Sequence, residues 1–195
     1  VGETKFSIND AVTVNGTVLY TERDGVMSGL NTLGEYSSTT GTTIIDLCGT
    51  EQTVGILNTS YQFDPVSNPT YYGVIGGEAG SKLVLNGGAL SARDVNVSFK
   101  VTDAVSLEMA WAGSAIRFRN FVSDSTGDLV VSAGTLGFTV NGGWSAGDVL
   151  VKGTGVLDID SDKAFTGGTQ KLTVRDDGKV IVRLGAAATF EALDL

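Results

Sequence analysis

The chain has 195 residues, of which 42% are hydrophobic and 27 are glycine, so its composition is that of an ordered protein. Its formal charge of −9 and pI of about 4.4 disfavour nucleic acid and anionic lipid as partners. The absence of histidine and the presence of a single cysteine exclude a catalytic histidine, an intrachain disulfide and a multi-cysteine zinc site.

The first 43 residues are the least regular part of the sequence. Apolar residues alternate around Gly16, which predicts short strands, whereas residues 21–41 are rich in polar residues and glycine and predict loops. Two strands are expected next, over residues 44–47 and 53–57, joined by a turn at residues 48–51.

Residues 58–73 interrupt this alternation and hold both prolines of the chain. Proline fixes φ and lacks the backbone donor of a sheet ladder, so the segment is predicted to be an inserted loop. Four aromatic side chains flank the prolines, and such a cluster can stack on sugar rings or anchor a protein partner. The candidate binding residues are Tyr61, Phe63, Tyr71 and Tyr72. The alternative is a loop whose rings pack inward.

A repeat occupies the second half of the chain. Its unit is apolar–x–apolar, a short gap to a glycine, and then a second apolar–x–apolar pair. Copies start at Leu83, Val105, Leu129, Val149 and Leu172, which are separated by 22, 24, 20 and 23 residues. A nearly constant period with two alternating strands per unit is typical of a β-solenoid with rungs of about 20–24 residues. The competing architecture is an antiparallel β-sandwich with Gly-Gly hairpins.

Each unit has one apolar face, so equivalent strands must stack on their neighbours to bury it. The outward-facing neighbours Val84, Val130 and Leu150 are expected on the outer face or under a loop. The following residues are predicted to face one continuous core: Leu83, Leu85, Leu129, Val131, Leu136, Phe138, Val149, Val151, Leu157, Ile159, Leu172, Val174, Val180 and Val182.

The stretch from residue 126 to residue 165 resembles a known family. It reads Gly-Asp-Leu-Val-Val-Ser-Ala-Gly-Thr-Leu-Gly-Phe and then Gly-Asp-Val-Leu-Val-Lys-Gly-Thr-Gly-Val-Leu-Asp-Ile. These phrases resemble the autotransporter-associated β-strand repeat of bacterial surface proteins. The resemblance implies a right-handed parallel β-helix in a protein that is secreted or displayed on the outer surface of a bacterium. It brings no shared catalytic residues.

Three carboxylates stand at alternate positions in the fourth repeat. Asp158, Asp160 and Asp162 suggest a site for a hard cation such as calcium. An EF-hand loop would have a glycine directly after the third aspartate, where this chain has a lysine. With Leu157 and Ile159 pointing inward, Asp158 and Asp160 are expected to face solvent, so the alternative to a calcium site is a solvated acidic face.

Other charged residues offer a catalytic alternative. Asp94, Asp103 and Glu108 could pair as the acid and base of a glycosidase or lyase, but so acidic a chain carries carboxylates throughout. Arg117 and Arg119 alternate along one strand, which favours an exposed basic strand that limits aggregation. We therefore expect no catalytic residues. The remaining single residues of interest are expected to have packing roles: Cys48, Trp111 and Trp144.

Residues 186–195 can end the chain as a helical turn or as a last strand. Phe190, Leu193 and Leu195 are predicted to cap the final rung. This cap would shield three residues from water: Val180, Val182 and Leu184.

Residues 1–195 are therefore expected to form a single β-solenoid segment. No apolar run approaches the roughly 18 residues that a membrane span needs, so membrane insertion by this segment is not expected. The chain begins at Val1 and shows no signal peptide, which favours a piece of a longer protein. The expected role is structural or adhesive, without a cofactor. Expected partners are a host surface glycan or protein, or neighbouring rungs of the full-length chain. The alternative function is a carbohydrate-active enzyme or carbohydrate-binding module on the same scaffold.

Overall fold

The computed structural model describes residues 11–14, 18–28, 30–35, 43–57, 73–87, 93–96, 99–119, 121–139, 142–144, 146–165 and 167–195. These residues form β-strands joined by turns, and the described chain contains no helix. Accordingly, no helix that could cross a membrane is found in the described residues.

The strands belong to two sheets in which every pairing is parallel. The larger sheet contains β1 (Ala11–Val14), β3 (Leu30–Glu35), β5 (Glu51–Leu57), β7 (Lys82–Leu85), β8 (Arg93–Asn96), β10 (Ser106–Arg119), β12 (Leu129–Thr139), β14 (Val149–Val151), β15 (Val156–Asp160), β16 (Lys171–Val174), β17 (Lys179–Val182) and β18 (Ala192–Asp194). The smaller sheet contains β2 (Val18–Tyr20), β4 (Thr43–Asp46), β6 (Gly73–Gly76), β9 (Phe99–Val101), β11 (Val122–Ser123) and β13 (Gly143–Trp144).

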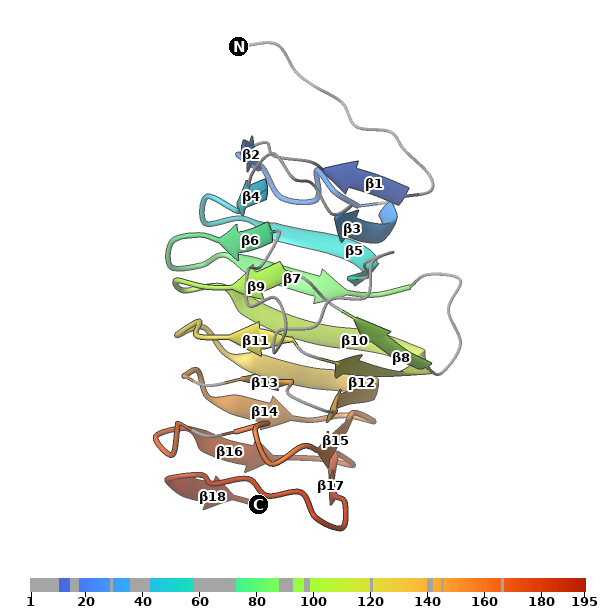
Figure 1. Ribbon diagram of the computed structural model, residues 1–195, viewed down its shortest axis with the longest axis vertical. Helices are drawn as coiled ribbons and strands as arrows, with labels where there is room; N and C mark the ends of the chain where they lie inside the picture. Colours follow the sequence, from blue (N-terminus) through green and yellow to red (C-terminus); the bar gives the residue numbers. More distant parts are fainter. Residues whose placement is uncertain are drawn as a thin grey trace.

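From β1 to β13 the chain returns repeatedly to the smaller sheet between strands of the larger one, and β14 to β18 all belong to the larger sheet, so the chain coils into a parallel β-solenoid (Figure 1). Strands β10 and β12 pass through a register shift near Met109 and Ala115, so their first parts pair with β7 and β14 and their second parts with β8 and β15. The predicted solenoid is thus confirmed. The antiparallel sandwich is wrong, because strands of equivalent phase stack in parallel instead of folding back as hairpins.

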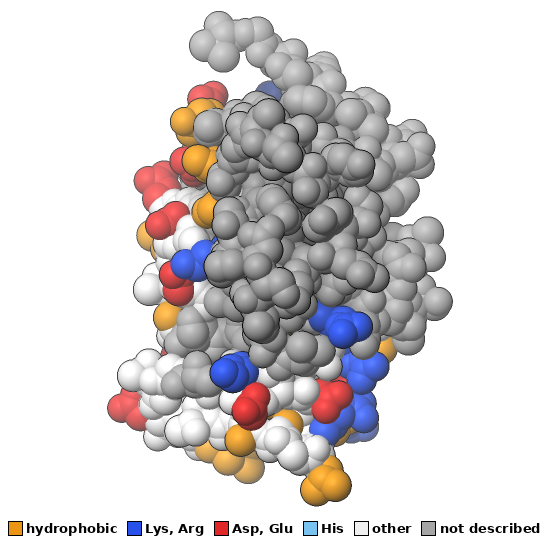
Figure 2. Space-filling view, viewed as in Figure 1, with side chains coloured by type: hydrophobic (Ala, Val, Ile, Leu, Met, Phe, Trp, Pro, Cys, Tyr) orange, Lys and Arg blue, Asp and Glu red, His pale blue; other side chains and the backbone are white. Residues whose placement is uncertain are grey.

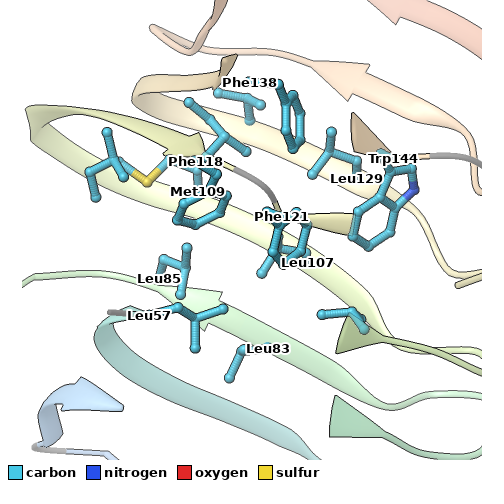
Figure 3. Packing of buried hydrophobic residues seen from close by; sticks show 14 of the residues in the cluster. Leu57, Leu83, Leu85, Leu107, Met109, Phe118, Phe121, Leu129, Phe138 and Trp144 are labelled. Atoms are coloured by element: carbon cyan, nitrogen blue, oxygen red, sulfur yellow. The ribbon is translucent and has the colours of Figure 1, made fainter. Parts of the chain in front are cut away.

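Register across the rungs explains why the repeat stacks. Leu107 lies opposite both Leu83 and Leu129, Leu129 lies opposite Val149, and Val149 lies opposite Leu172. Side chains with the same phase therefore form columns that point into the interior (Figure 3). Of the predicted core, these residues are buried: Leu83, Leu85, Leu129, Val131, Leu136, Phe138, Val149, Val151, Leu157, Ile159 and Leu172.

The exceptions lie near the C-terminal end of the stack. Val174 and Val180 are only partly buried, although both pack against the core, and Val182 is 55% exposed, so its assignment to the core is wrong. Its inward phase is correct, since it lies opposite the buried Ile159. Among the described residues, no rung lies over Val182 to cover it. Val84 shows the opposite effect: it is off the core phase and yet only 7% exposed.

Aromatic rings form a continuous chain through the lower half of the core. Among the described rings, Phe138 has three neighbours, with ring centroids 6.5 Å from Phe118, 6.2 Å from Phe121 and 5.7 Å from Phe165. The chain of contacts ends at Phe190, whose ring lies 5.0 Å from that of Phe165. Because these rings come from successive turns of the coil, they tie the rungs together.

The last ten residues add a strand to the stack. Strand β18 pairs in parallel with β16, and Leu193 takes the place opposite Leu172 that the repeat provides. Phe190 is partly buried, whereas Leu193 is 61% exposed and Leu195 is exposed as well. The predicted shielding of Val182 and Leu184 is wrong, since both remain exposed.

The N-terminal part is more regular than its composition predicts. Strand β3 lies within residues 21–41, which were expected to be loops, and it pairs in parallel with β1 and β5. Composition alone missed this strand because its pairing partners stabilise it. The two strands predicted around residues 44–47 and 53–57 are confirmed as β4 and β5. Residues 58–72 of the predicted inserted loop lie outside the described residues.

Candidate functional site

The outer face of the smaller sheet carries exposed apolar side chains. Leu19, Ile45 and Ile75 share one inward column, so the residues beside them on β2, β4 and β6 point away from the core. Tyr20 is 60% exposed and Ile44 is 40% exposed. Neither is needed for the core, which makes this face the first candidate for a contact surface.

A cavity of about 550 Å³ lies on this face, beside the turns that follow β4 and β6. Gly76 stands opposite Asp46 in the ladder and contributes no side chain to the hollow. A Cβ atom at Gly76 would lie 2.5 Å from a carboxylate oxygen of Asp103. The cavity is lined by Ile44, Asp46, Cys48, Val74, Gly76, Gly77, Glu78 and Asp103.

The turns around the cavity hold two of these residues in the left-handed region. The φ angles are +48° at Cys48 and +58° at Asp103. The Cys48 amide donates a 2.9 Å hydrogen bond to Oδ1 of Asp46, and the Thr102 hydroxyl donates a 3.0 Å hydrogen bond to Oδ2 of Asp103. Burial and the neighbouring Asp46 raise the pKa of the Cys48 thiol, so it stays protonated near neutral pH. Cys48 thus lines the cavity and is not simply a packing residue of the core.

Three carboxylates of the cavity have no cationic partner among the described residues. No ion pair of the described residues involves Asp46, Glu78 or Asp103. By contrast, Asp124 is paired with Lys100, and Glu108 is paired with Lys82. Figure 2 shows acidic and hydrophobic side chains side by side along the left edge, over the turns that follow β2, β4 and β6. The site is therefore a partly apolar hollow with uncompensated negative charge.

The carboxylates considered for catalysis are divided between different parts of the fold. Asp103 lines the cavity, whereas Glu108 on β10 accepts a hydrogen bond from Ser132 and forms a 2.6 Å ion pair with Lys82. Burial by itself would raise the pKa of Glu108, but the bonds from Lys82 and Ser132 outweigh it and hold that pKa below its usual value. Glu108 is thereby fixed as a structural anion. The side chain of Asp94 lies outside the described residues.

The three aspartates proposed for calcium have different surroundings. Asp158 is 4% exposed, so the expectation that it faces solvent is wrong. The Arg183 guanidinium covers it and donates from Nε at 2.7 Å and from Nη2 at 2.5 Å. Asp160 lies 3.5 Å from Arg117 and 3.9 Å from Arg183. No group of three metal-ligating side chains is found among the described residues, and cationic groups occupy the space beside two of these carboxylates.

The remaining candidates lie in the core, on the surface or outside the described residues. Trp144 is fully buried against Phe121, with 6.5 Å between ring centroids (Figure 3). Trp111 is only partly buried. Arg119 is exposed at the end of β10, as expected. The four aromatic residues of the predicted binding loop lie outside the described residues: Tyr61, Phe63, Tyr71 and Tyr72.

Sequence analysis did not find the cavity. Its only local signal is the Gly76–Gly77 pair at the end of an alternating strand, which removes two side chains in succession. Comparison of the chain with protein-family models, curated proteins and solved structures finds no match.

Proposed function

We propose that the chain is a non-catalytic, structural or adhesive segment of a secreted or surface-exposed bacterial protein. The observation that carries this proposal is the parallel stack itself. Its inward columns are mostly apolar from rung to rung, with Gln52 opposite Leu83 and Ser123 opposite Val101 as buried polar exceptions, and each internal rung is hydrogen-bonded to the rung on either side. Such a stack resists bending and stretching, because deformation must break ladder bonds and expose core together. It acts as a stiff rod whose side faces make contacts.

The distribution of charge favours a scaffold over an enzyme. Catalysis needs polar groups that converge on one point with matched pKa values. Here Glu108 is neutralised by Lys82, and Asp158 is neutralised by Arg183. Both pairs connect different rungs and lie on the outside of the strands, which is where charged side chains stabilise and solubilise a solenoid.

The proposed location rests on the resemblance to the autotransporter-associated β-strand repeat. Surface proteins of that kind display parallel β-helices outside the bacterial cell, and the strongly acidic, cysteine-poor composition is compatible with this location. Antibodies raised against the chain should label intact cells of the producing bacterium. Labelling that appears only after the cells are permeabilised would overturn the proposed location.

The test of the adhesive role uses the fluorescently labelled chain on immobilised extracellular-matrix proteins and on a glycan array. We expect saturable binding to at least one protein or glycan surface, and no turnover across a panel of soluble polysaccharides. Absence of saturable binding to every surface would remove the adhesive role. Turnover that is abolished by one acidic substitution would show the chain to be an enzyme.

One observation favours the alternative of a carbohydrate-active protein. Asp46, Glu78 and Asp103 line a hollow large enough for a sugar residue, and carboxylates are common partners of sugar hydroxyls. The same glycan array tests it. Binding to a glycan that is lost when these three carboxylates are neutralised would identify a carbohydrate-binding module.

A further inference from the structure

We propose that the cavity beside β4 and β6 binds a basic, extended segment of another protein. The recognised pattern is an apolar residue, any residue, and then Lys or Arg. This inference rests on the proposed adhesive function and names the chemistry of one partner. It is carried by three features of the surface: exposed apolar side chains, uncompensated carboxylates and the spacing between them.

The apolar half of the surface lies at one end of the cavity. Ile44 stands opposite Val74 in the ladder between β4 and β6, and both line the cavity. Ile44 is 40% exposed and Val74 is partly exposed. Since the two face outward, their exposed surface is free to be covered by an apolar side chain of a partner.

The acidic half of the surface lies at the other end. Asp46 follows Ile44 by two residues on the same strand, so both side chains leave the same face of the sheet. Glu78 and Asp103 come from the next two turns of the coil and converge on the same hollow. Because no ion pair of the described residues engages these three carboxylates, a cationic group that enters the hollow is attracted by all of them.

The spacing between the two halves matches an extended peptide. Residues i and i+2 of a strand are separated by about 6.5 Å, and this holds both for Ile44 and Asp46 and for the side chains of a ligand strand. A segment aligned with β4 therefore places an apolar side chain over Ile44 and Val74 when its basic side chain two residues later enters the acidic hollow. An acidic ligand is excluded by the same carboxylates, and the net charge of −9 adds to this exclusion.

The test measures binding of a fluorescent peptide, Gly-Ser-Val-Thr-Arg-Thr-Ser-Gly, by anisotropy at low salt. The comparison peptides carry Glu in place of Arg, or Ser in place of Val. The triple variant Asp46→Asn, Glu78→Gln and Asp103→Asn removes three charges without loss of fold. Asn keeps the acceptor that Cys48 needs at position 46, and it tolerates the left-handed φ at position 103.

A matched control removes the same number of charges far from the cavity. Asp162, Asp177 and Glu191 are exposed and have no ion pair among the described residues, so their substitution by Asn, Asn and Gln changes net charge alone. We expect the triple cavity variant to bind the Arg peptide about tenfold more weakly. The control variant should stay within about twofold of the unmodified chain.

Cys48 provides a second readout at the cavity itself. It is the only cysteine of the chain and it lines the hollow, so a bound peptide should slow its modification by a small thiol reagent. No binding of the Arg peptide at millimolar concentration, equal binding of the two triple variants, or binding that leaves the Cys48 reaction rate unchanged would each overturn the inference.

The outcome also separates this inference from the proposed function. If the chain adheres to a surface and the cavity variant adheres equally well, the cavity inference fails and the adhesive function stands. If the peptide binds as expected but the chain adheres to no tested surface, the adhesive function fails and the cavity remains a peptide site.

Discussion

Replacement of Phe138 by alanine should destabilise the protein more than any change at the end of the stack. Phe138 is fully buried and contacts three aromatic rings that come from its own and neighbouring rungs. The substitution leaves a cavity in a segment where the rungs are held together by these contacts. Phe190 offers an internal comparison, because it is only partly buried and contacts Phe165 alone among the described rings.

The expected magnitudes follow from burial and from the number of ring contacts. A buried Phe→Ala change costs about 3–5 kcal/mol, and the loss of three ring partners places Phe138→Ala in the upper half, at about 4–5 kcal/mol. Phe190→Ala should cost about 1–2 kcal/mol, because part of that ring is already in water. Phe138→Leu keeps most of the volume and should cost less than about 2 kcal/mol.

The assay is urea denaturation at 25 °C, followed both by far-UV circular dichroism and by the fluorescence of Trp144 and Trp111. Total stability of a domain is about 5–15 kcal/mol, so Phe138→Ala should remain folded in the absence of urea but unfold at a clearly lower concentration. If Phe138→Ala costs no more than Phe190→Ala, the aromatic chain does not tie the rungs together and the argument from packing is refuted.

Three further outcomes are expected. The pKa of Glu108 is lowered in the folded protein, so the stabilisation that Glu108 provides is present above the unfolded pKa of 4.5 and is lost as the pH falls through the folded pKa. Glu108→Gln should therefore flatten the acid limb of a plot of Tm against pH. An unchanged acid limb would contradict this. The pKa of Lys82 is raised in the folded protein, since its hydrogen bonds and charge interactions with Glu108 and Glu51 outweigh its burial. The stabilisation that Lys82 provides is therefore present below the unfolded pKa of 10.5 and is lost as the pH rises through the folded pKa. Lys82→Met should flatten the alkaline limb of the plot of Tm against pH. Gly147→Ala should cost about 1–3 kcal/mol in urea denaturation, because its Cβ would collide with the carbonyl group of Gly127 on an adjacent rung. A Cβ at Gly113 would make only an ordinary van der Waals contact, 3.7 Å from Nε1 of Trp111, so Gly113→Ala should change stability little; equal costs would be evidence against the close approach of rungs at Gly147.

The candidate site was much less accessible from sequence than the fold. No local pattern places Glu78 and Asp103 beside Asp46, because the three belong to successive turns and meet only when the turns stack. The same is true of Asp158, for which strand alternation correctly predicts an outward side chain. Alternation cannot predict that Arg183, from the next rung, lies over that side chain and buries it.

The sequence by itself determined the phase of the strands in the repeat and their parallel stacking. Alternation has a period of two residues and depends only on local backbone geometry, so Leu129, Val149 and Leu172 are identified as inward residues without knowledge of their neighbours. Burial at the ends and on the outer faces was decided by the tertiary structure. Val182 has the same inward phase as Ile159 and is nevertheless exposed, because burial requires a covering rung, and that contact comes from chain some twenty residues away.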